Sequence, residues 1–392
     1  MELGLMEPVV VTGVGLVSAL GDDAPIAWHR LLANESAIAL RQPFLELPPG
    51  PLAMIGKTPV AVSSLVETTV LAALTDAQLS SPLPDCGVVI GSSRSHQGEW
   101  EALARQRLGQ VERTTKATPH PWLETLPHQT AVRAAQQVGS GGPVLAPMAA
   151  CATGIWALAQ GFELIRTGQC DLVIAGAVEA PITPLTLAGF AKMGAQAQTG
   201  CYPFDEAREG LVLGEGAAVI VLERASLAAQ RGVPVYGEIR GFGLLNDAHH
   251  ITSPAARCDT AIAAVRQCLH RSHLTPADID FIHTHGTATQ RNDQMEAAIA
   301  ATIFPKNTAI TATKGATGHT LGASGAMGTV FSLLALRHQQ LPPCVGLKTP
   351  AFDLNFVRQT TAAPLSHAIC CSFGFGGQNT AVALSRAASI LG

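Results

Sequence analysis

The sequence predicts an α/β protein built from two core-forming halves, and two observations lead to this. Short apolar runs alternate with longer stretches of helical pattern along the chain, as in folds whose strands are buried on both faces. The length of 392 residues also exceeds the roughly 250–300 residues that a single hydrophobic core usually supports.

Each predicted strand is a short apolar run, and the stretches between the runs have the helical pattern. The predicted strands cover residues 8–14, 86–90, 171–175, 217–222, 235–240, 280–283, 308–311 and 368–372. The Pro-rich stretch 40–59 is expected to be a surface excursion.

The chain is expected to divide at residues 223–234, where charges and Gly232-Val233-Pro234 interrupt the apolar pattern. The predicted halves are 1–230 and 231–392. A β-type run leads into a Gly-containing turn on each side of this seam, at residues 9–13 and 235–241, which indicates a duplicated fold.

Composition limits the possible partners. Charged residues make up only 14% of the chain, against about 25% in an average domain, so much of the surface is expected to be buried or shared with another subunit. The net charge is −4 and no basic run occurs, which argues against nucleic-acid binding. Nine cysteines without C-x-x-C spacing form neither a disulfide framework nor a zinc motif.

Targeting and membrane signals are weak. Residues 1–8 lack the basic and apolar regions of a signal peptide, which predicts a cytoplasmic protein. Two uncharged stretches, 134–162 and 315–336, are long enough to cross a bilayer. Both contain polar residues throughout, so buried helices of an α/β protein are the better interpretation and no membrane span is expected.

The most informative residue is Cys151, which precedes a run of helical pattern. A cysteine at the first turn of a helix faces free N–H groups and the positive end of the helix dipole, which predicts a lowered pKa and a nucleophilic thiolate. The alternative for Cys151 alone is a small packed residue at a helix start.

Two histidine motifs favour the nucleophile. His285 follows the apolar strand 280–283, and His319 lies in a Gly-rich turn after the strand 308–311. The carboxyl ends of such strands are where α/β sheets place ligands. A lone histidine there would more often be a satisfied polar residue. The pair His283 and His285 could also ligate a metal, but no third ligand is evident and no metal is expected.

A glycine-rich loop completes the set. Residues 372–379 follow the strand 368–372, and Gly374, Gly376 and Gly377 allow a tight turn that brings backbone N–H groups near a reacting carbonyl. Such a loop could instead cradle a phosphate, but it lacks the lysine of a P-loop and the setting of a dinucleotide motif.

Together these motifs resemble the β-ketoacyl-acyl carrier protein synthases, the condensing enzymes of fatty-acid and polyketide synthesis. The resemblance begins at residues 9–18, passes through 203–205 and 208–217, and ends at Phe373-Gly374-Phe375-Gly376-Gly377. A cysteine followed by histidines in H-G-T-x-T and G-H-T-L-G-A contexts is similar to the elongating type. The resemblance implies a thiolase-like fold, with duplicated βα halves in a five-layered αβαβα arrangement.

The resemblance also implies roles for the central residues. Cys151 takes an acyl chain from the phosphopantetheine arm of an acyl carrier protein. Malonyl-carrier protein then loses carbon dioxide, and its enolate attacks the thioester to give a β-ketoacyl product two carbons longer. His285 and His319, each with a proton on Nε2, assist the decarboxylation, and Lys314 supports them.

Further roles follow from the same resemblance. The backbone N–H groups of Cys151 and Phe375 form an oxyanion hole, and Phe375 is the gate between acyl pocket and malonyl site. Thr287 and Thr289 bind the pantetheine arm. No cofactor is bound, since phosphopantetheine arrives on the carrier protein. A homodimer, or a heterodimer with a related synthase-like chain, is expected.

Several positions depart from the family pattern. Gly328 stands where elongating enzymes usually carry a glutamate, Gln378 where threonine is commoner, and residues 290–293 replace a Pro-containing segment. A divergent branch is therefore expected. Trp156 could narrow the acyl pocket or only fill the core. The alternatives to elongation are a thiolase-fold acyltransferase or decarboxylase and a non-catalytic chain-length partner.

Overall fold

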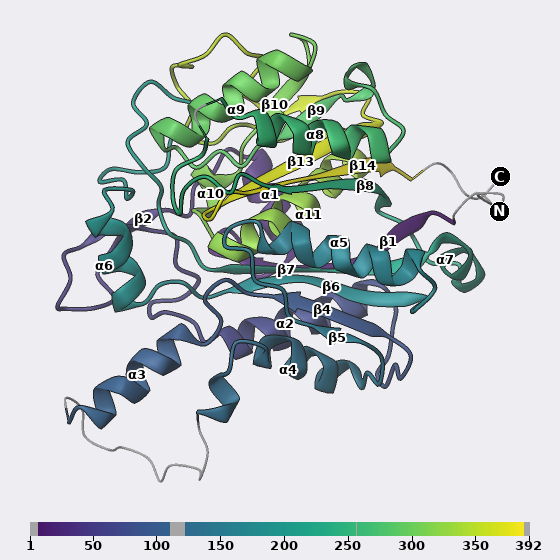
Figure 1. The fold of residues 1–392 in the computed structure, drawn as a ribbon, viewed down its shortest axis with the longest axis horizontal. Coiled ribbons are helices and arrows are strands. Elements are labelled where there is room, and N and C mark those ends of the chain that lie inside the picture. Colours follow the sequence, from purple (N-terminus) through teal and green to yellow (C-terminus); the bar gives the residue numbers. More distant parts are fainter. Residues whose placement is uncertain (1–6, 110–121, 256, 388–392) are drawn as a thin grey trace.

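The computed structural model describes residues 7–109, 122–255 and 257–387, and its main feature is one ten-stranded sheet made of two equivalent sets (Figure 1). The first set is β1 (Val9–Ser18), β4 (Gly87–Gly91), β5 (Val144–Leu145), β6 (Leu172–Glu179) and β7 (Gly216–Arg224). The second is β8 (Gly237–Asn246), β9 (Phe281–His283), β10 (Ala309–Thr311), β13 (His367–Gly374) and β14 (Gln378–Arg386).

Both sets have the same topology. Their spatial orders are β1-β7-β6-β4-β5 and β8-β14-β13-β9-β10. In each set the first strand pairs antiparallel with the last and the last antiparallel with the fourth, while the remaining pairs are parallel. The sets join where Val9, Val10 and Val11 of β1 pair with β8. This repeated order confirms the predicted duplication.

Helices add three layers to the two sheet layers (Figure 1). The helices α2 (Val62–Asp76) and α4 (Gln129–Val138) cover one outer face, and α8 (Asp259–Arg271) and α9 (Gln290–Ile303) lie over the other. Between the layers formed by the two strand sets, α5 (Thr153–Arg166) contacts α11 (Ser324–His338). The helix α11 is buried over nearly its whole length. The five-layered arrangement predicted from the resemblance is confirmed.

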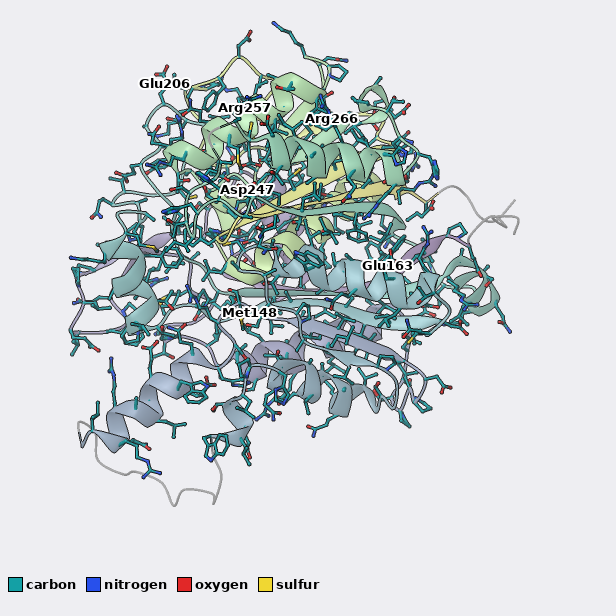
Figure 2. All side chains as sticks on the ribbon, in the orientation of Figure 1. Met148, Glu163, Glu206, Asp247, Arg257 and Arg266 are labelled. Carbon is teal, nitrogen blue, oxygen red and sulfur yellow. The ribbon has the colours of Figure 1, made fainter. Side chains whose placement is uncertain are left out.

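Shorter elements connect these layers. The helices are α1 (Ala24–Leu32), α3 (Gln97–Arg107), α6 (Pro184–Lys192), α7 (Ala225–Arg231) and α10 (Lys314–Thr317), with 3₁₀ turns η1 (Leu123–Thr125), η2 (Pro276–Asp278) and η3 (Leu321–Ala323). Two small hairpins are β2 (Ala39–Arg41) with β3 (Gly50–Leu52) and β11 (Gln340–Leu341) with β12 (Thr361–Ala362). Glu163, Arg257 and Arg266 illustrate how charged side chains lie on the outside (Figure 2).

The structure corrects some expectations. All eight predicted strands form, but β5 and β14 were not among them. The uncharged stretch 134–162 is not one helix, because it holds the end of α4, β5 and most of α5. The excursion at 40–59 contains the β2–β3 hairpin, and Leu52 is buried. Among the described residues no helix has the length and apolarity needed to cross a bilayer, and residues 1–6, part of the stretch expected to lack a signal peptide, lie outside them.

Candidate active site

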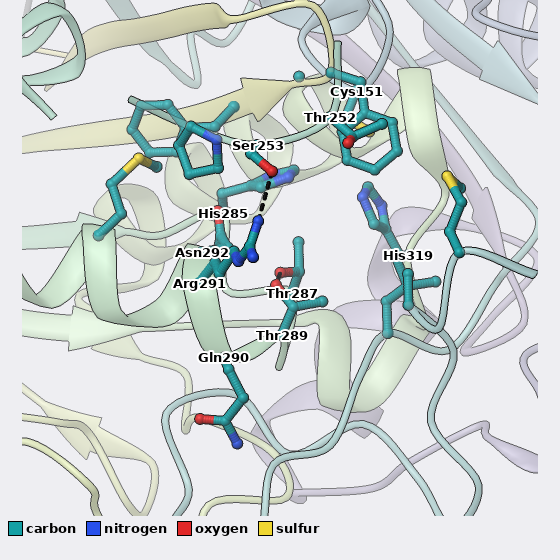
Figure 3. A pocket seen from close by; sticks show the side chains of 18 of the residues that line it. Cys151, Thr252, Ser253, His285, Thr287, Thr289, Gln290, Arg291, Asn292 and His319 are labelled. Atoms are coloured by element: carbon teal, nitrogen blue, oxygen red, sulfur yellow. Dashed lines mark hydrogen bonds between the residues drawn. The ribbon is translucent and has the colours of Figure 1, made fainter. Parts of the chain in front are cut away.

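Cys151, His285 and His319 meet in a cavity of about 440 Å³ (Figure 3). Cys151 precedes α5, His285 follows β9, and His319 lies between α10 and η3. The thiol sulfur and one nitrogen of each imidazole lie within 4.8 Å of one another, and all three residues are buried. The fold therefore assembles the three residues that the sequence singled out, from both halves of the chain.

Cys151 sits on a strained turn. Ala150 has a φ of +48°, in the left-handed region that residues with a side chain rarely adopt. The hydroxyl of Thr153 holds the turn by donating to Ala150 O at 2.6 Å and accepting from Ala149 N at 2.8 Å. The end of β13 comes so close that a Cβ on Gly374 would lie 2.8 Å from Ala149 O, so this position requires glycine.

The expected lowering of the Cys151 pKa is wrong for the resting site. The pKa of this thiol is raised to about 11, mainly by burial, and the nearby Glu179 carboxylate contributes to the increase. Lys314 and the backbone N–H of Phe375 lower it, but they do not offset the loss of solvent. Cys151 also lies two residues before α5 rather than within its first turn. The Cys151 side chain at rest is therefore a thiol rather than a thiolate.

His285 is held as a hydrogen-bond donor. The Glu296 carboxylate accepts from the backbone N–H groups of His285 at 2.7 Å and Gly286 at 2.6 Å, which fixes the turn after β9. The Lys314 ammonium donates to His285 O and lies 3.2 Å from His285 Nδ1. Because Nδ1 faces a donor, the proton of the neutral ring is on Nε2.

His319 has the same tautomer for a different reason. The backbone N–H of Leu321, which can only donate, lies 3.1 Å from His319 Nδ1. Nδ1 therefore accepts, and Nε2 carries the proton. Burial and the charge of Lys314 hold the pKa of both His285 and His319 well below the usual 6.5, so both rings are neutral donors. This agrees with the tautomers that the resemblance implied.

The remaining predicted residues mostly line the same cavity. Thr287 and Thr289 lie side by side with their hydroxyl oxygens 2.9 Å apart, and Phe375 stacks on Phe190 with ring centroids 6.1 Å apart. The backbone N–H of Phe375 points to the Cys151 sulfur, where an oxyanion-hole donor would lie.

Lys314 is not among the described residues that line the cavity, and neither is Trp156. The indole N–H of Trp156 donates to Gln378 Oε1 at 3.2 Å. The tryptophan and the unusual glutamine thus form one contact between α5 and the start of β14. A role for Trp156 in the acyl pocket stays a prediction.

His283 explains the glycine at position 328. A Cβ on Gly328 would lie 2.7 Å from His283 Cε1 and 2.9 Å from Cys370 Sγ, so no side chain fits there without rearrangement. His283 Nε2 lies 3.1 Å from the Thr313 hydroxyl, next to Lys314. The imidazole occupies the space into which a side chain at 328 would project.

Glu296 is a buried carboxylate at the candidate site that the sequence analysis did not single out. Its buried carboxylate is the main charge that favours the ammonium form of Lys314, although burial lowers the lysine pKa overall. Burial and the nearby Asp293 raise the Glu296 pKa to about 7. Glu296 lies 11 residues after His285, in a stretch of helical pattern. This position in the sequence is the signal that could have identified it.

The three central residues are also possible metal ligands. Cysteine and histidine are the side chains that bind zinc, and Cys151, His285 and His319 offer three such atoms. His283 does not join them, because its ring contacts Thr313 and Cys370 instead. That the site works without a metal stays a prediction.

Comparisons with known proteins decide the family. The family "Beta-ketoacyl synthase, N-terminal domain" matches residues 60–228, and "Beta-ketoacyl synthase, C-terminal domain" matches residues 236–348. The chain belongs to the β-ketoacyl synthase family. A 3-oxoacyl-[acyl-carrier-protein] synthase 2 of Staphylococcus aureus is 30% identical to this β-ketoacyl synthase, over 96% of this chain and 98% of the relative.

Solved structures agree with this assignment. A type II polyketide ketosynthase, in complex with its acyl-carrier protein and bound to a hexaketide, is similar to this β-ketoacyl synthase with a TM-score of 0.89 at 25% identity. The comparison covers 97% of this chain and all of that one. A ketosynthase in complex with its chain length factor from Xenorhabdus doucetiae gives a TM-score of 0.85 at 26% identity, covering 99% and 100% of the two chains.

Proposed function

We propose that this β-ketoacyl synthase carries an acyl chain on Cys151 and extends it by decarboxylative Claisen condensation with malonyl-acyl carrier protein. The observation that carries the proposal is the pair of neutral imidazoles, each with its Nδ1 satisfied and its Nε2–H left for a substrate, beside the Cys151 thiol. Two donors facing one sulfur suit a site that stabilises negative charge on a thioester carbonyl.

The first half-reaction is acyl transfer. The Cys151 sulfur attacks the thioester carbonyl of the acyl donor, and the C–S bond to the pantetheine arm breaks. The proton of the Cys151 thiol ends on the released arm, so no net acid or base is consumed. The raised thiol pKa is compatible with this, because deprotonation is needed only as the new bond forms.

The second half-reaction forms the carbon–carbon bond. The malonyl carboxylate leaves as carbon dioxide, and its electron pair becomes an enolate whose oxygen accepts hydrogen bonds from His285 and His319. The enolate carbon attacks the acyl thioester on Cys151, and the thiolate that leaves takes up a proton. The tetrahedral oxyanion faces the backbone N–H groups of Cys151 and Phe375, and each such donor contributes about 10²–10³ in rate.

The partners follow from the same chemistry. Phosphopantetheine arrives on an acyl carrier protein and passes Thr287 and Thr289, so the enzyme needs no resident cofactor. A second chain, identical or related, is expected at the sheet edge formed by β5. Val144, Leu145 and Met148 are 39%, 37% and 55% exposed there, and an unpaired edge with apolar residues favours pairing. We assign the two halves to residues 1–230 and 231–392.

The test uses purified enzyme with acyl-carrier proteins of several chain lengths and malonyl-carrier protein. Intact-mass analysis should show an acyl group on the enzyme, and then a β-ketoacyl product two carbons longer. Cys151→Ala is the control and should show neither. Acylation without extension would favour the acyltransferase alternative, and no acylation by any donor would refute the assignment of Cys151.

A further inference from the structure

The rim of the active-site cavity carries one feature that the proposed reaction does not use. Cys151, His285 and His319 form its buried floor, while Gln290 and Arg291 are exposed at its rim. Arg291 is the only arginine or lysine among the described residues that line this cavity. It also falls in the segment 290–293, where the sequence departs from the family pattern.

The Arg291 side chain reaches toward Ser253, to which it is hydrogen-bonded (Figure 3). Its Nη1 donates to the Ser253 hydroxyl at 2.6 Å, which joins α9 to the loop after β8. Within the described part of the chain this guanidinium forms no ion pair.

The two carboxylates that line the cavity have other partners. Glu209 accepts from the backbone N–H groups of Gln198 and Thr199 and from the Thr199 hydroxyl. Asp247 accepts from Ala255 N at 3.1 Å and Asn379 Nδ2 at 2.7 Å. The positive charge of Arg291 is therefore not neutralised by the acids of the cavity it lines.

We propose that Arg291, together with the Ser253 hydroxyl, binds the phosphate of the phosphopantetheine arm. The inference rests on the proposed function, in which the reactive end of that arm lies at Cys151. The phosphate is at the opposite end of the arm and carries negative charge, so it lies where the cavity opens. A guanidinium binds phosphate oxygens through paired N–H donors, and a hydroxyl adds a third donor.

The position of Arg291 on its helix adds to this. It is the second residue of α9, a helix of 14 residues whose N-terminal end lines the cavity from Thr289 to Asn292. The dipole of α9 increases the positive potential at the guanidinium. The chain thus has a charged contact for the substrate arm at a place that no catalytic residue occupies.

The test compares two substrates that differ only in the phosphate, malonyl-phosphopantetheine and malonyl-pantetheine, in place of the malonyl-carrier protein. With Cys151 acylated, the wild-type enzyme should use the phosphorylated thioester about tenfold more efficiently in kcat/KM. Arg291→Gln should abolish this preference by lowering only the value for the phosphorylated substrate, and Arg291→Lys should keep part of it.

Arg257→Gln is the matched control, because Arg257 is 87% exposed, pairs with Asp259 and does not line the cavity. It should leave the preference unchanged. The inference is overturned if Arg291→Gln retains the wild-type preference, or if it weakens only carrier-protein substrates and not free phosphopantetheine thioesters. Failure of Cys151 acylation in the wild-type enzyme would refute the proposed function instead, so the two outcomes are separable.

Discussion

The imidazole of His283 and the absent side chain of Gly328 occupy the same space. His283 lies on β9 and Gly328 on α11, and a Cβ at 328 would lie 2.7 Å from Cε1 and 2.8 Å from Nδ1 of that ring. Contacts this short do not occur between real side chains. The sizes of the residues at 283 and 328 are therefore coupled. The coupled pair lies next to Lys314, since the His283 ring contacts Thr313.

Gly328→Ala should destabilise the fold by about 1–3 kcal/mol, because α11 and β9 are packed too tightly for the extra methyl group. The free energy of unfolding from urea titration measures this. His283→Ala in the same chain should recover part of the loss, since the ring that the new methyl group would meet is then absent. Strictly additive losses in the double variant would contradict the coupling.

Stability should fall with acid because the buried histidines are neutral. Burial lowers the pKa of His283 to about 3, against 6.5 for the free side chain. Between these values the unfolded chain binds a proton that the folded chain does not, so stability is present above pH 6.5 and is lost as the pH falls toward 3. Urea titrations at pH 7.5 and 5.0 should show a smaller loss in His283→Asn than in the wild type, and an equal loss would argue against a neutral buried ring.

Lys314→Met should slow the release of carbon dioxide from a malonyl thioester by about 10²–10³. The substitution removes the donor at His285 Nδ1, so the ring no longer has a fixed proton on Nε2. Lys306→Met is a suitable control, because Lys306 is 93% exposed and pairs with Asp353 at the surface. A wild-type decarboxylation rate in Lys314→Met would exclude the tautomer argument.

Alkylation of Cys151 by iodoacetamide should accelerate with pH well beyond neutrality, since the pKa of the thiol is raised to about 11 and only the thiolate reacts. Peptide mass spectrometry at a series of pH values follows this residue separately from the other cysteines. Lys314→Met should move the profile to higher pH, because the ammonium lowers the thiol pKa. If the wild-type alkylation rate instead reached a plateau below pH 8, the thiolate would be stabilised and the raised pKa would be contradicted.

Much of the fold could be predicted from local pattern. Buried strands such as β4 and β6 are continuous apolar runs, and the sequence identifies them directly. β5 is only two half-exposed residues at an edge, and its pairing with β4 leaves no local signal. β14 begins at Gln378, directly after the glycine turn. Its polar first residues read as part of that turn, so the start of the strand could not be predicted from the sequence.

The candidate site was predictable in residue identity but not in electrostatics. Motif context located Cys151, His285 and His319, and the structure brings them together. The thiol pKa could not be predicted, because burial by residues distant in sequence outweighs the local helix dipole. The partners of Trp156 and Gly328 also lie far away in the chain, at Gln378 and His283.

The position of β1 has a consequence for synthesis of the chain. All ten of its residues are buried, yet its neighbours β7 and β8 begin only at Gly216 and Gly237. A growing chain emerges N-terminal end first, so this apolar strand stays unpaired until about two hundred further residues have been synthesised. The nascent polypeptide is thus most exposed to aggregation before the second half begins, and a chain truncated before β7 should recruit chaperones.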